Sequence, residues 1–126
     1  MPNTDRPTIL IVEDEALVRM LGCDVLESAG YEVLEAETAD EAVALLEQHD
    51  DVQLLFSDID MPGSMDGLEL AELVHRRWPK IGLLITSGHH RPSEDTLPDD
   101  GRFIPKPWKE SAVLSELRAI MTSKSD

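Results

Sequence analysis

Short apolar runs that alternate with helical patterns constrain this chain more than any other feature of its sequence. Continuous apolar runs rich in β-branched residues are typical of strands that are buried on both faces, as in a parallel sheet. Five segments fit a strand, the second being weaker and the fifth brief: Thr8 to Val12, Tyr31 to Glu35, Val52 to Ser57, Ile81 to Ile85 and Arg102 to Ile104. The chain is therefore expected to form a sheet whose strands are connected by helices.

Helices are predicted between the strands, because apolar residues recur there at three- and four-residue spacing, the pattern of a helix with one buried face. The first helix is expected to end at Gly30 and to bury a stripe made of Leu17, Val18, Leu21, Val25 and Ala29. Thr38 and Glu41 form a possible capping box for the second helix. The third begins at about Leu68, and the last covers Lys109 to Met121, followed by a frayed tail.

The segment from Gly88 to Gly101 interrupts this alternation. It contains Pro92, Pro98 and several acidic residues, so the fourth of the expected helices is predicted to be short or irregular. Strands that alternate with helices predict an α/β fold with helices on both faces of a parallel sheet. We expect the flavodoxin-like, doubly wound five-stranded sheet with strand order 2-1-3-4-5. That order places the first strand beside the third, with the carboxyl ends of the strands along one edge.

The size and charge of the chain limit its function. With 126 residues, of which 41% are hydrophobic, it can form one core, so we expect a single domain over residues 1–126 with a core of about 8–121. A net charge of −15 repels nucleic-acid phosphates and anionic membranes, so neither is an expected partner. Cys23 is the only cysteine, and no apolar stretch has the length of a signal peptide or a membrane span. These features predict a cytoplasmic protein.

Polar residues follow four of the predicted strands at their carboxyl ends, where folds of this kind bind ligands. They are Glu13 and Asp14 after the first strand, Asp58 and Asp60 after the third, Thr86 and Ser87 after the fourth, and Lys106 after the fifth. Carboxylates that converge repel each other and need a cation or a shared proton, and Mg²⁺ suits a few carboxylates with waters and phosphate oxygens. Any one of these residues alone would be an ordinary loop residue. Together they predict an aspartyl-phosphate site at Asp58, with Thr86 and Lys106 as donors.

The motifs at these strand ends resemble those of a known family. They are the pair Glu13-Asp14, Asp58 within Phe-Ser-Asp-Ile-Asp-Met-Pro, Met65-Asp66-Gly67, Thr86, and Lys106 within Pro-Lys-Pro. Over roughly Thr8 to Met121 the chain is similar to the receiver domain of two-component response regulators. The resemblance implies a signalling phosphoacceptor rather than an enzyme, in which Asp58 is phosphorylated from a histidine on a sensor kinase or a phosphotransfer protein.

The resemblance also implies roles for the neighbouring residues. Mg²⁺ would be bound by Asp14, Asp58 and the backbone carbonyl of Asp60, with Glu13 acting through water. Thr86 and Lys106 would contact the phosphoryl oxygens. Phe103 lies three residues before Lys106 and matches the aromatic switch position of the family, where the ring follows the threonine after phosphorylation; ordinary core filling is an equal alternative. Trp108 is expected to cover an edge of the core or to face a partner.

The chain departs from the family pattern in several places. The first acid is Glu13 rather than the commoner aspartate, the loop from Met61 to Asp66 is one residue longer than usual, and Asp60 adds a carboxylate beside the site. The segment from His89 to Asp100 occupies the place of the family's fourth helix, which is part of a surface that commonly signals to outputs. Output through that surface is therefore in doubt. The histidine pair that opens the segment is expected to be solvated rather than to bind a metal.

Alternative functions remain open at this point. We expect a stand-alone receiver that signals by phosphorylation-dependent binding of an unknown partner or by a phosphorelay, and the start at Met1 with a short tail favours it over a receiver of a hybrid histidine kinase. Asp58-Ile-Asp60 also matches the Asp-x-Asp pair of haloacid dehalogenase-type phosphatases, although that pair belongs on a first strand. A flavodoxin-like electron carrier would need a phosphate loop after the first strand, where Glu13 and Asp14 would repel phosphate.

Overall fold

The sheet and its helices follow one another in strict alternation until the fourth strand. The computed structural model describes residues 6–89, 92, 97–98 and 101–125. In chain order the elements are β1 (Thr8–Val12), α1 (Ala16–Ser28), β2 (Glu32–Ala36), α2 (Ala39–Gln48), β3 (Val52–Asp58), α3 (Gly67–Arg77), β4 (Gly82–Ser87), β5 (Arg102–Pro105) and α4 (Glu110–Ser125). The label α4 therefore belongs to the helix at the carboxyl end.

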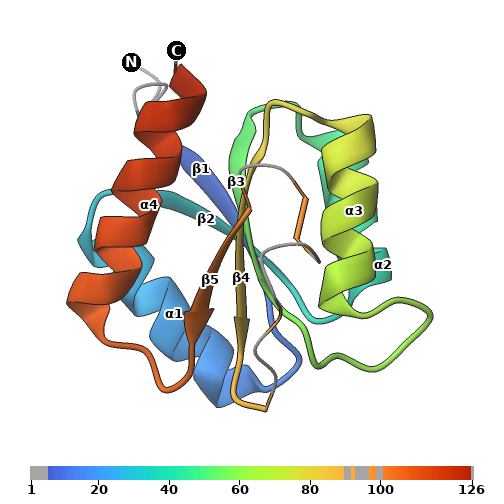
Figure 1. Ribbon diagram of the computed structural model, residues 1–126, viewed down its shortest axis with the longest axis horizontal. Helices are drawn as coiled ribbons and strands as arrows, with labels where there is room; N and C mark the ends of the chain where they lie inside the picture. Colours follow the sequence, from blue (N-terminus) through green and yellow to red (C-terminus); the bar gives the residue numbers. More distant parts are fainter. Residues whose placement is uncertain (1–5, 90–91, 93–96, 99–100, 126) are drawn as a thin grey trace.

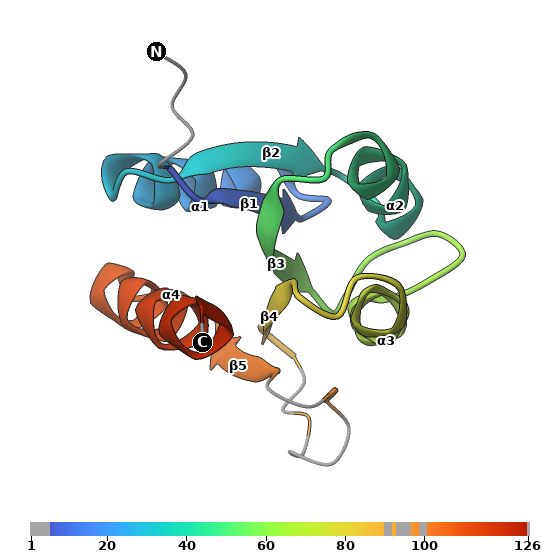
Figure 2. The same ribbon diagram turned by 90° about the horizontal axis from the view of Figure 1, so that it is seen from above.

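The strands form one parallel five-stranded sheet in the order β2-β1-β3-β4-β5. The predicted α/β fold with strand order 2-1-3-4-5 is confirmed, and each strand lies within two residues of its expected bounds. Helices α2 and α3 cover one face of the sheet, while α1 and α4 cover the other, as Figures 1 and 2 show from two directions. Every strand is thus packed between two layers, which explains why β1, β3 and β4 are almost entirely buried.

The two faces of the sheet carry separate apolar cores because side chains along a strand alternate between the faces. One core joins the sheet to α2 and α3 through residues such as Leu55, Leu70 and Val74. The other joins it to α1 and α4, with Phe56 and Leu117 among its members. All five of these side chains are at most 1% exposed, so each helical layer is fixed to the sheet by buried contacts.

Helix α1 buries a different face from the predicted stripe. Gly22, Cys23 and Leu26 are its buried residues, whereas Leu17 and Leu21 are 75% and 62% exposed. The helix approaches the sheet at Gly22, where an added Cβ would lie 2.5 Å from Cδ1 of Ile11. The smallest residues set this contact. Of the predicted stripe, Val18 and Val25 are half-buried, and Val25 packs against the core, whereas Leu17 and Leu21 stay in solvent. Burial also raises the pKa of the Cys23 thiol to about 12, so the thiol stays protonated at neutral pH.

The ends of the helices show which capping patterns the chain uses. Thr38 caps α2 by accepting a hydrogen bond from the backbone of Glu41, as predicted, but the Glu41 carboxylate accepts from the backbone of Glu37 instead of completing the box. The complete box lies at α3, where Asp66 and Glu69 each accept from the other's backbone N–H. The tail from Thr122 was expected to fray, but α4 continues through it to Ser125, beyond the buried residue Ile120.

Most of the segment between β4 and β5 lies outside the described residues. This includes His90 and the place of the family's fourth helix, so the expectation of a short or irregular helix there stays a prediction. Of residues 88–101, the described ones (88, 89, 92, 97, 98 and 101) are not helical. Within the described ranges, no helix has the length and apolar character needed to cross a membrane.

The observed face of α1 can be tested by two leucine truncations in the same helix. Leu26→Ala removes a side chain with no exposed surface and should lower the free energy of unfolding by about 3 kcal/mol, because it leaves a cavity in a packed core. Leu17→Ala should lower it by less than about 0.5 kcal/mol. Chemical denaturation of both variants measures the difference. A larger loss at Leu17 than at Leu26 would mean that the predicted stripe faces the sheet, and equal losses would contradict the difference in burial between the two side chains.

Candidate functional site

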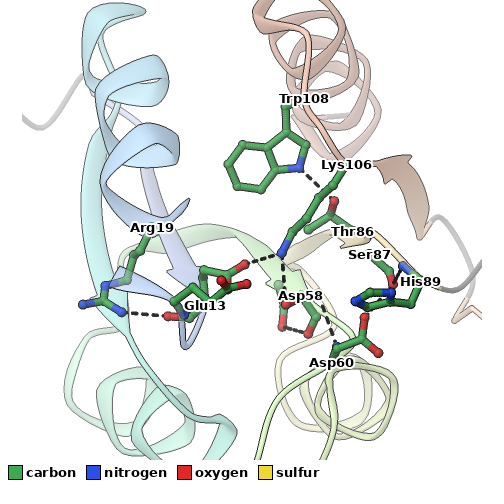
Figure 3. A network of polar contacts seen from close by, with 11 residues as sticks. Glu13, Arg19, Asp58, Asp60, Thr86, Ser87, His89, Lys106 and Trp108 are labelled. Carbon is green, nitrogen blue, oxygen red and sulfur yellow. Dashed lines mark hydrogen bonds and ion pairs between the residues drawn. The ribbon is translucent and has the colours of Figure 1, made fainter. Parts of the chain in front are cut away.

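The candidate site lies at the carboxyl ends of the strands, on the face of the sheet that α1 and α4 cover. Along each strand, every second side chain points to this face, and we call such a row of side chains a column. On the face covered by α1 and α4, each apolar column ends in a polar residue two positions beyond its last apolar residue. The columns run from Ile11 to Glu13, from Phe56 to Asp58, from Leu84 to Thr86 and from Ile104 to Lys106. Asp58 and Thr86 are also register partners on neighbouring strands. Because side chains on a strand alternate between the two faces, Glu13, Asp58, Thr86 and Lys106 all lie on this face and come together at its carboxyl end (Figure 3).

Lys106 connects two buried carboxylates. Its Nζ donates to Oε1 of Glu13 at 2.7 Å and to Oδ2 of Asp58 at 3.2 Å. Glu13 is 1% exposed and Asp58 is 3% exposed, so water can do little to stabilise their charges. One ammonium group between two carboxylates leaves the cluster with an excess of negative charge, which a bound cation could balance.

The pKa values of these groups are shifted chiefly by burial and by the contacts of Lys106. Burial raises the pKa of Asp58, although the Lys106 charge and the backbone N–H of Asp60 lower it in part. Burial likewise raises the pKa of Glu13, against the opposing hydrogen bond from Lys106. Burial alone would lower the pKa of Lys106, but its hydrogen bond to Glu13 and the charge of Asp58 outweigh burial and raise it. The ammonium stays charged, and both carboxylates hold their protons more tightly than they would in water.

Three carboxyl groups could hold a metal ion. Glu13, Asp14 and Asp58 each offer an oxygen, and these oxygens lie within 4.8 Å of one another. Hard oxygen ligands of this kind suit Mg²⁺, which is usually bound by one or two carboxylates together with waters and phosphate oxygens. The donor set therefore fits the predicted ion, and a bound cation would offset the cost of burial that raises the pKa of Glu13 and of Asp58.

Thr86 is held by an aromatic residue. Its Oγ1 accepts a hydrogen bond of 2.8 Å from Nε1 of Trp108, and the threonine is 2% exposed. Phe103, the predicted switch residue, is a register partner of Ile85 and packs against the core on the face of α2 and α3. Its side chain thus belongs to the opposite face from Thr86. The switch role of Phe103 stays a prediction.

The loop after β3 is fixed close to Asp58. The backbone N–H of Asp60 donates to Oδ1 of Asp58 at 3.2 Å, and the hydroxyl of Ser87 donates to Oδ2 of Asp60 at 2.7 Å. Gly67, at the start of α3, lies so near that an added Cβ would be 2.0 Å from the Asp58 carbonyl oxygen. The Asp-Gly of the predicted motif is explained by this close approach. His89 is exposed and donates only its backbone N–H to Ser87 among the contacts of the described residues.

Sequence reasoning missed two residues that hold this site in place. Arg19 on α1 donates from its guanidinium to the backbone carbonyl of Glu13 at 2.8 Å, which ties α1 to the end of β1. Trp108 was expected only at an edge of the core or at a partner, yet it contacts Thr86 directly. Its place two residues after Lys106 is the signal that could have found it, because both residues belong to the segment that follows β5.

Comparisons with known proteins agree with this geometry. The chain matches the profile of the response regulator receiver domain over residues 9–118. It is 35% identical to the sensor kinase CckA of Brucella abortus over 90% of this chain, but over only 12% of that protein. The chain belongs to the response regulator receiver domain family. It spans between 12% and 52% of the length of the curated relatives that it matches.

Solved structures show the same fold. A CheY-like receiver domain from Methanospirillum hungatei superposes with a TM-score of 0.85 at 28% identity, covering 95% of this chain and 97% of that one. The receiver domain of the hybrid histidine kinase CckA superposes with a TM-score of 0.75 at 31% identity, covering 89% and 96%. The likeness extends over nearly the whole of each domain, so the described core is that of a receiver.

The charge balance of the site can be tested at Lys106. Lys106→Met leaves two buried carboxylates without their cation, so at pH 7 the free energy of unfolding should fall by an amount on the order of 3 kcal/mol. Because Glu13 and Asp58 have raised pKa values in the folded protein, the cost of burying their negative charges is present in full above those values. It disappears below the pKa values of the unfolded chain, near 4, where both carboxyls are protonated in either state. Urea unfolding between pH 7 and pH 4 should therefore show the difference from wild type shrinking as the pH falls.

Lys109→Met is the matched control for this prediction, since Lys109 is exposed and should change stability by less than about 0.5 kcal/mol at any of these pH values. A loss at Lys106 that does not depend on pH would contradict the electrostatic explanation and would point to lost packing instead.

Proposed function

We propose that this chain is a phosphorylation-dependent signalling receiver in which Asp58 accepts a phosphoryl group. The observation that carries the proposal is the convergence of a buried carboxylate with an ammonium donor, a hydroxyl and two further acids at one strand edge. Receiver domains are signalling phosphoacceptors, and the acids, Thr86 and Lys106 of this chain resemble the residues of their site. Its role is that of an acceptor which assists its own phosphorylation and dephosphorylation, not that of an enzyme acting on an external substrate.

Each residue of the site has a separate role in phosphoryl transfer. An oxygen of Asp58 attacks the phosphorus of a phosphohistidine, the P–N bond breaks, and the freed histidine nitrogen takes a proton. Lys106 and Thr86 donate hydrogen bonds to the phosphoryl oxygens, where charge is held during transfer. Asp14, Asp58 and the backbone carbonyl of Asp60 would hold Mg²⁺, with Glu13 acting through water, and the ion would supply positive charge to the carboxylates and the phosphoryl group.

The partners follow from this chemistry. The donor is a sensor histidine kinase or a histidine phosphotransfer protein, and a downstream protein recognises the phosphorylated state. The net charge of −15 favours basic protein surfaces and disfavours direct contact with nucleic acid or a membrane. We also propose a cytoplasmic location, which a single buried and protonated thiol at Cys23 suits.

A receiver within a hybrid histidine kinase is the second candidate. The similarity to CckA, both in sequence and in the structure of its receiver, favours this arrangement over other multidomain ones. The mass of the protein in an extract of its own cells separates the two possibilities. A stand-alone receiver gives a species of 14.0 kDa, whereas a hybrid kinase gives a much larger one that contains the same peptides.

Phosphorylation itself is tested by intact mass. Incubation with acetyl phosphate and Mg²⁺ should add one phosphoryl group that is lost on standing, because an aspartyl phosphate is a reactive acyl phosphate. Asp58→Ala should add none, and chelation of Mg²⁺ should lower labelling of the wild type at least ten-fold, the loss that follows from removing about 1.4 kcal/mol of transition-state stabilisation.

Asp60→Asn is the matched control for this experiment, since it removes the neighbouring carboxylate and keeps both the backbone carbonyl and Asp58. It should still be labelled. Label on Asp58→Ala but not on Asp60→Asn would reverse the assignment of the nucleophile. Continuous release of phosphate from many phosphomonoesters would instead support the phosphatase reading of the Asp-Ile-Asp sequence.

A further inference from the structure

Trp108 contacts a site residue through its one polar atom. The indole N–H is a donor only, and it is directed at Oγ1 of Thr86, 2.8 Å away. A threonine hydroxyl has one hydrogen and two acceptor positions, so the indole occupies one acceptor position. Within the described part of the chain the hydroxyl donates no side-chain hydrogen bond, and Thr86 lies beside Asp58 on the neighbouring strand (Figure 3).

The Trp108 ring is itself fixed by packing. Its centroid lies 5.1 Å from that of Phe56, with the planes tilted by 46°, and Nζ of Lys106 lies 5.9 Å from the ring centroid. Gly22 of α1 lets the ring approach, since an added Cβ there would lie 3.2 Å from Cζ3. Because the Trp108 ring is packed against the core, Lys106 and α1, it has little freedom to lose when its N–H binds the Thr86 hydroxyl. It can therefore hold that hydroxyl in one orientation at little entropic cost.

The position of Trp108 in the chain couples it to the phosphoryl donors. Lys106 and Trp108 are separated by one residue, and they reach Asp58 and Thr86 respectively. The same short segment therefore supplies one donor directly and fixes the second donor through a hydrogen bond. Phe103 cannot do this from the opposite face of the sheet, where it packs with the core of α2 and α3.

We propose that Trp108 is a positioning residue for phosphoryl transfer. Its indole N–H bonds Oγ1 of Thr86 and so directs the hydroxyl hydrogen toward the phosphoryl group on Asp58. The proposal rests on the proposed function, in that the hydroxyl is positioned for an incoming phosphoryl group. It adds a residue that acts through Thr86 and does not itself touch the transferred group.

The rate of phosphorylation tests the hydrogen bond. Trp108→Phe keeps an aromatic ring and removes the N–H, and it should slow labelling by acetyl phosphate and Mg²⁺ about five-fold, the factor for one neutral hydrogen bond. In a Thr86→Val background the same substitution should have no further effect, because the acceptor is gone. Trp78→Phe, at the other tryptophan, is the matched control and should label at the wild-type rate.

The indole resonance gives a readout that a purely structural role would not move. The chain has two tryptophans, so Trp78→Phe leaves one indole ¹H–¹⁵N signal, that of Trp108. Thr86→Val should shift this signal upfield through loss of the acceptor, whereas Thr86→Ser should leave it near its original position. Addition of beryllofluoride with Mg²⁺, a phosphoryl mimic, should shift the signal in the Ser variant and not in the Val variant.

The outcomes separate this inference from the proposed function. If the wild type takes up no phosphoryl group, both fail. If the wild type is labelled and Trp108→Phe is labelled at the same rate, only the role of Trp108 is overturned. Equal slowing by Trp108→Phe in the Thr86 and Thr86→Val backgrounds would also overturn it, because the tryptophan would then act by packing. If the indole signal of Trp108 is the same with Thr, Ser or Val at position 86, the role of Trp108 is also overturned. This result does not depend on whether Trp108→Phe folds.

Discussion

The charge imbalance around Lys106 is the constraint on which the site depends. Two carboxylates with almost no exposure share one ammonium group, so the folded protein holds negative charge that it cannot fully neutralise. Burial raises the pKa of both acids, which means that their ionisation opposes folding. Three acids with oxygens within 4.8 Å of one another are tolerated because the rest of the sheet is well packed between two helical layers, and a cation held by the three acids could balance part of their charge.

The fold was predictable because its signals are local and repeated. Strands buried on both faces leave continuous apolar runs, and their alternation with helices allows few topologies. The error at α1 has a physical cause in the same chain. Its larger apolar residues, Leu17 and Leu21, define a clear stripe, yet the helix packs through Gly22. Periodicity counts apolar residues and cannot tell which of two adjacent faces makes the closer contact, since that depends on the opposing surface of Ile11 and Trp108.

The acids and donors of the site were predictable for a different reason. Each stands at the end of a strand, and a parallel sheet brings such ends together without further information. Arg19 and Trp108 were not predictable in this way, because their roles arise from contacts across 6 and 22 residues of sequence. The hydrogen bond from Ser87 to Asp60 has the same origin. Arg19 and Trp108 hold the site through tertiary geometry, and apart from the place of Trp108 two residues after Lys106, their local pattern does not distinguish them from residues that fill space.

The site and the core of this domain share the same strands, because the apolar side chains of the core and the polar side chains of the site follow one another on one face of each strand. Phe56 lies two residues before Asp58 on the same face of β3 and packs against the Trp108 ring. The aromatic pair therefore lies next to both Asp58 and Thr86, the hydrogen-bond partner of Trp108. A shift of the ring would alter the support of Thr86 and the surface next to Gly22 of α1 in the same step. Under the proposed function, a phosphoryl group added at the strand ends would therefore act on a part of the molecule where helix, sheet and loop meet. One tryptophan thus bonds Thr86 beside Asp58, packs against Phe56 and lies next to Gly22 of α1.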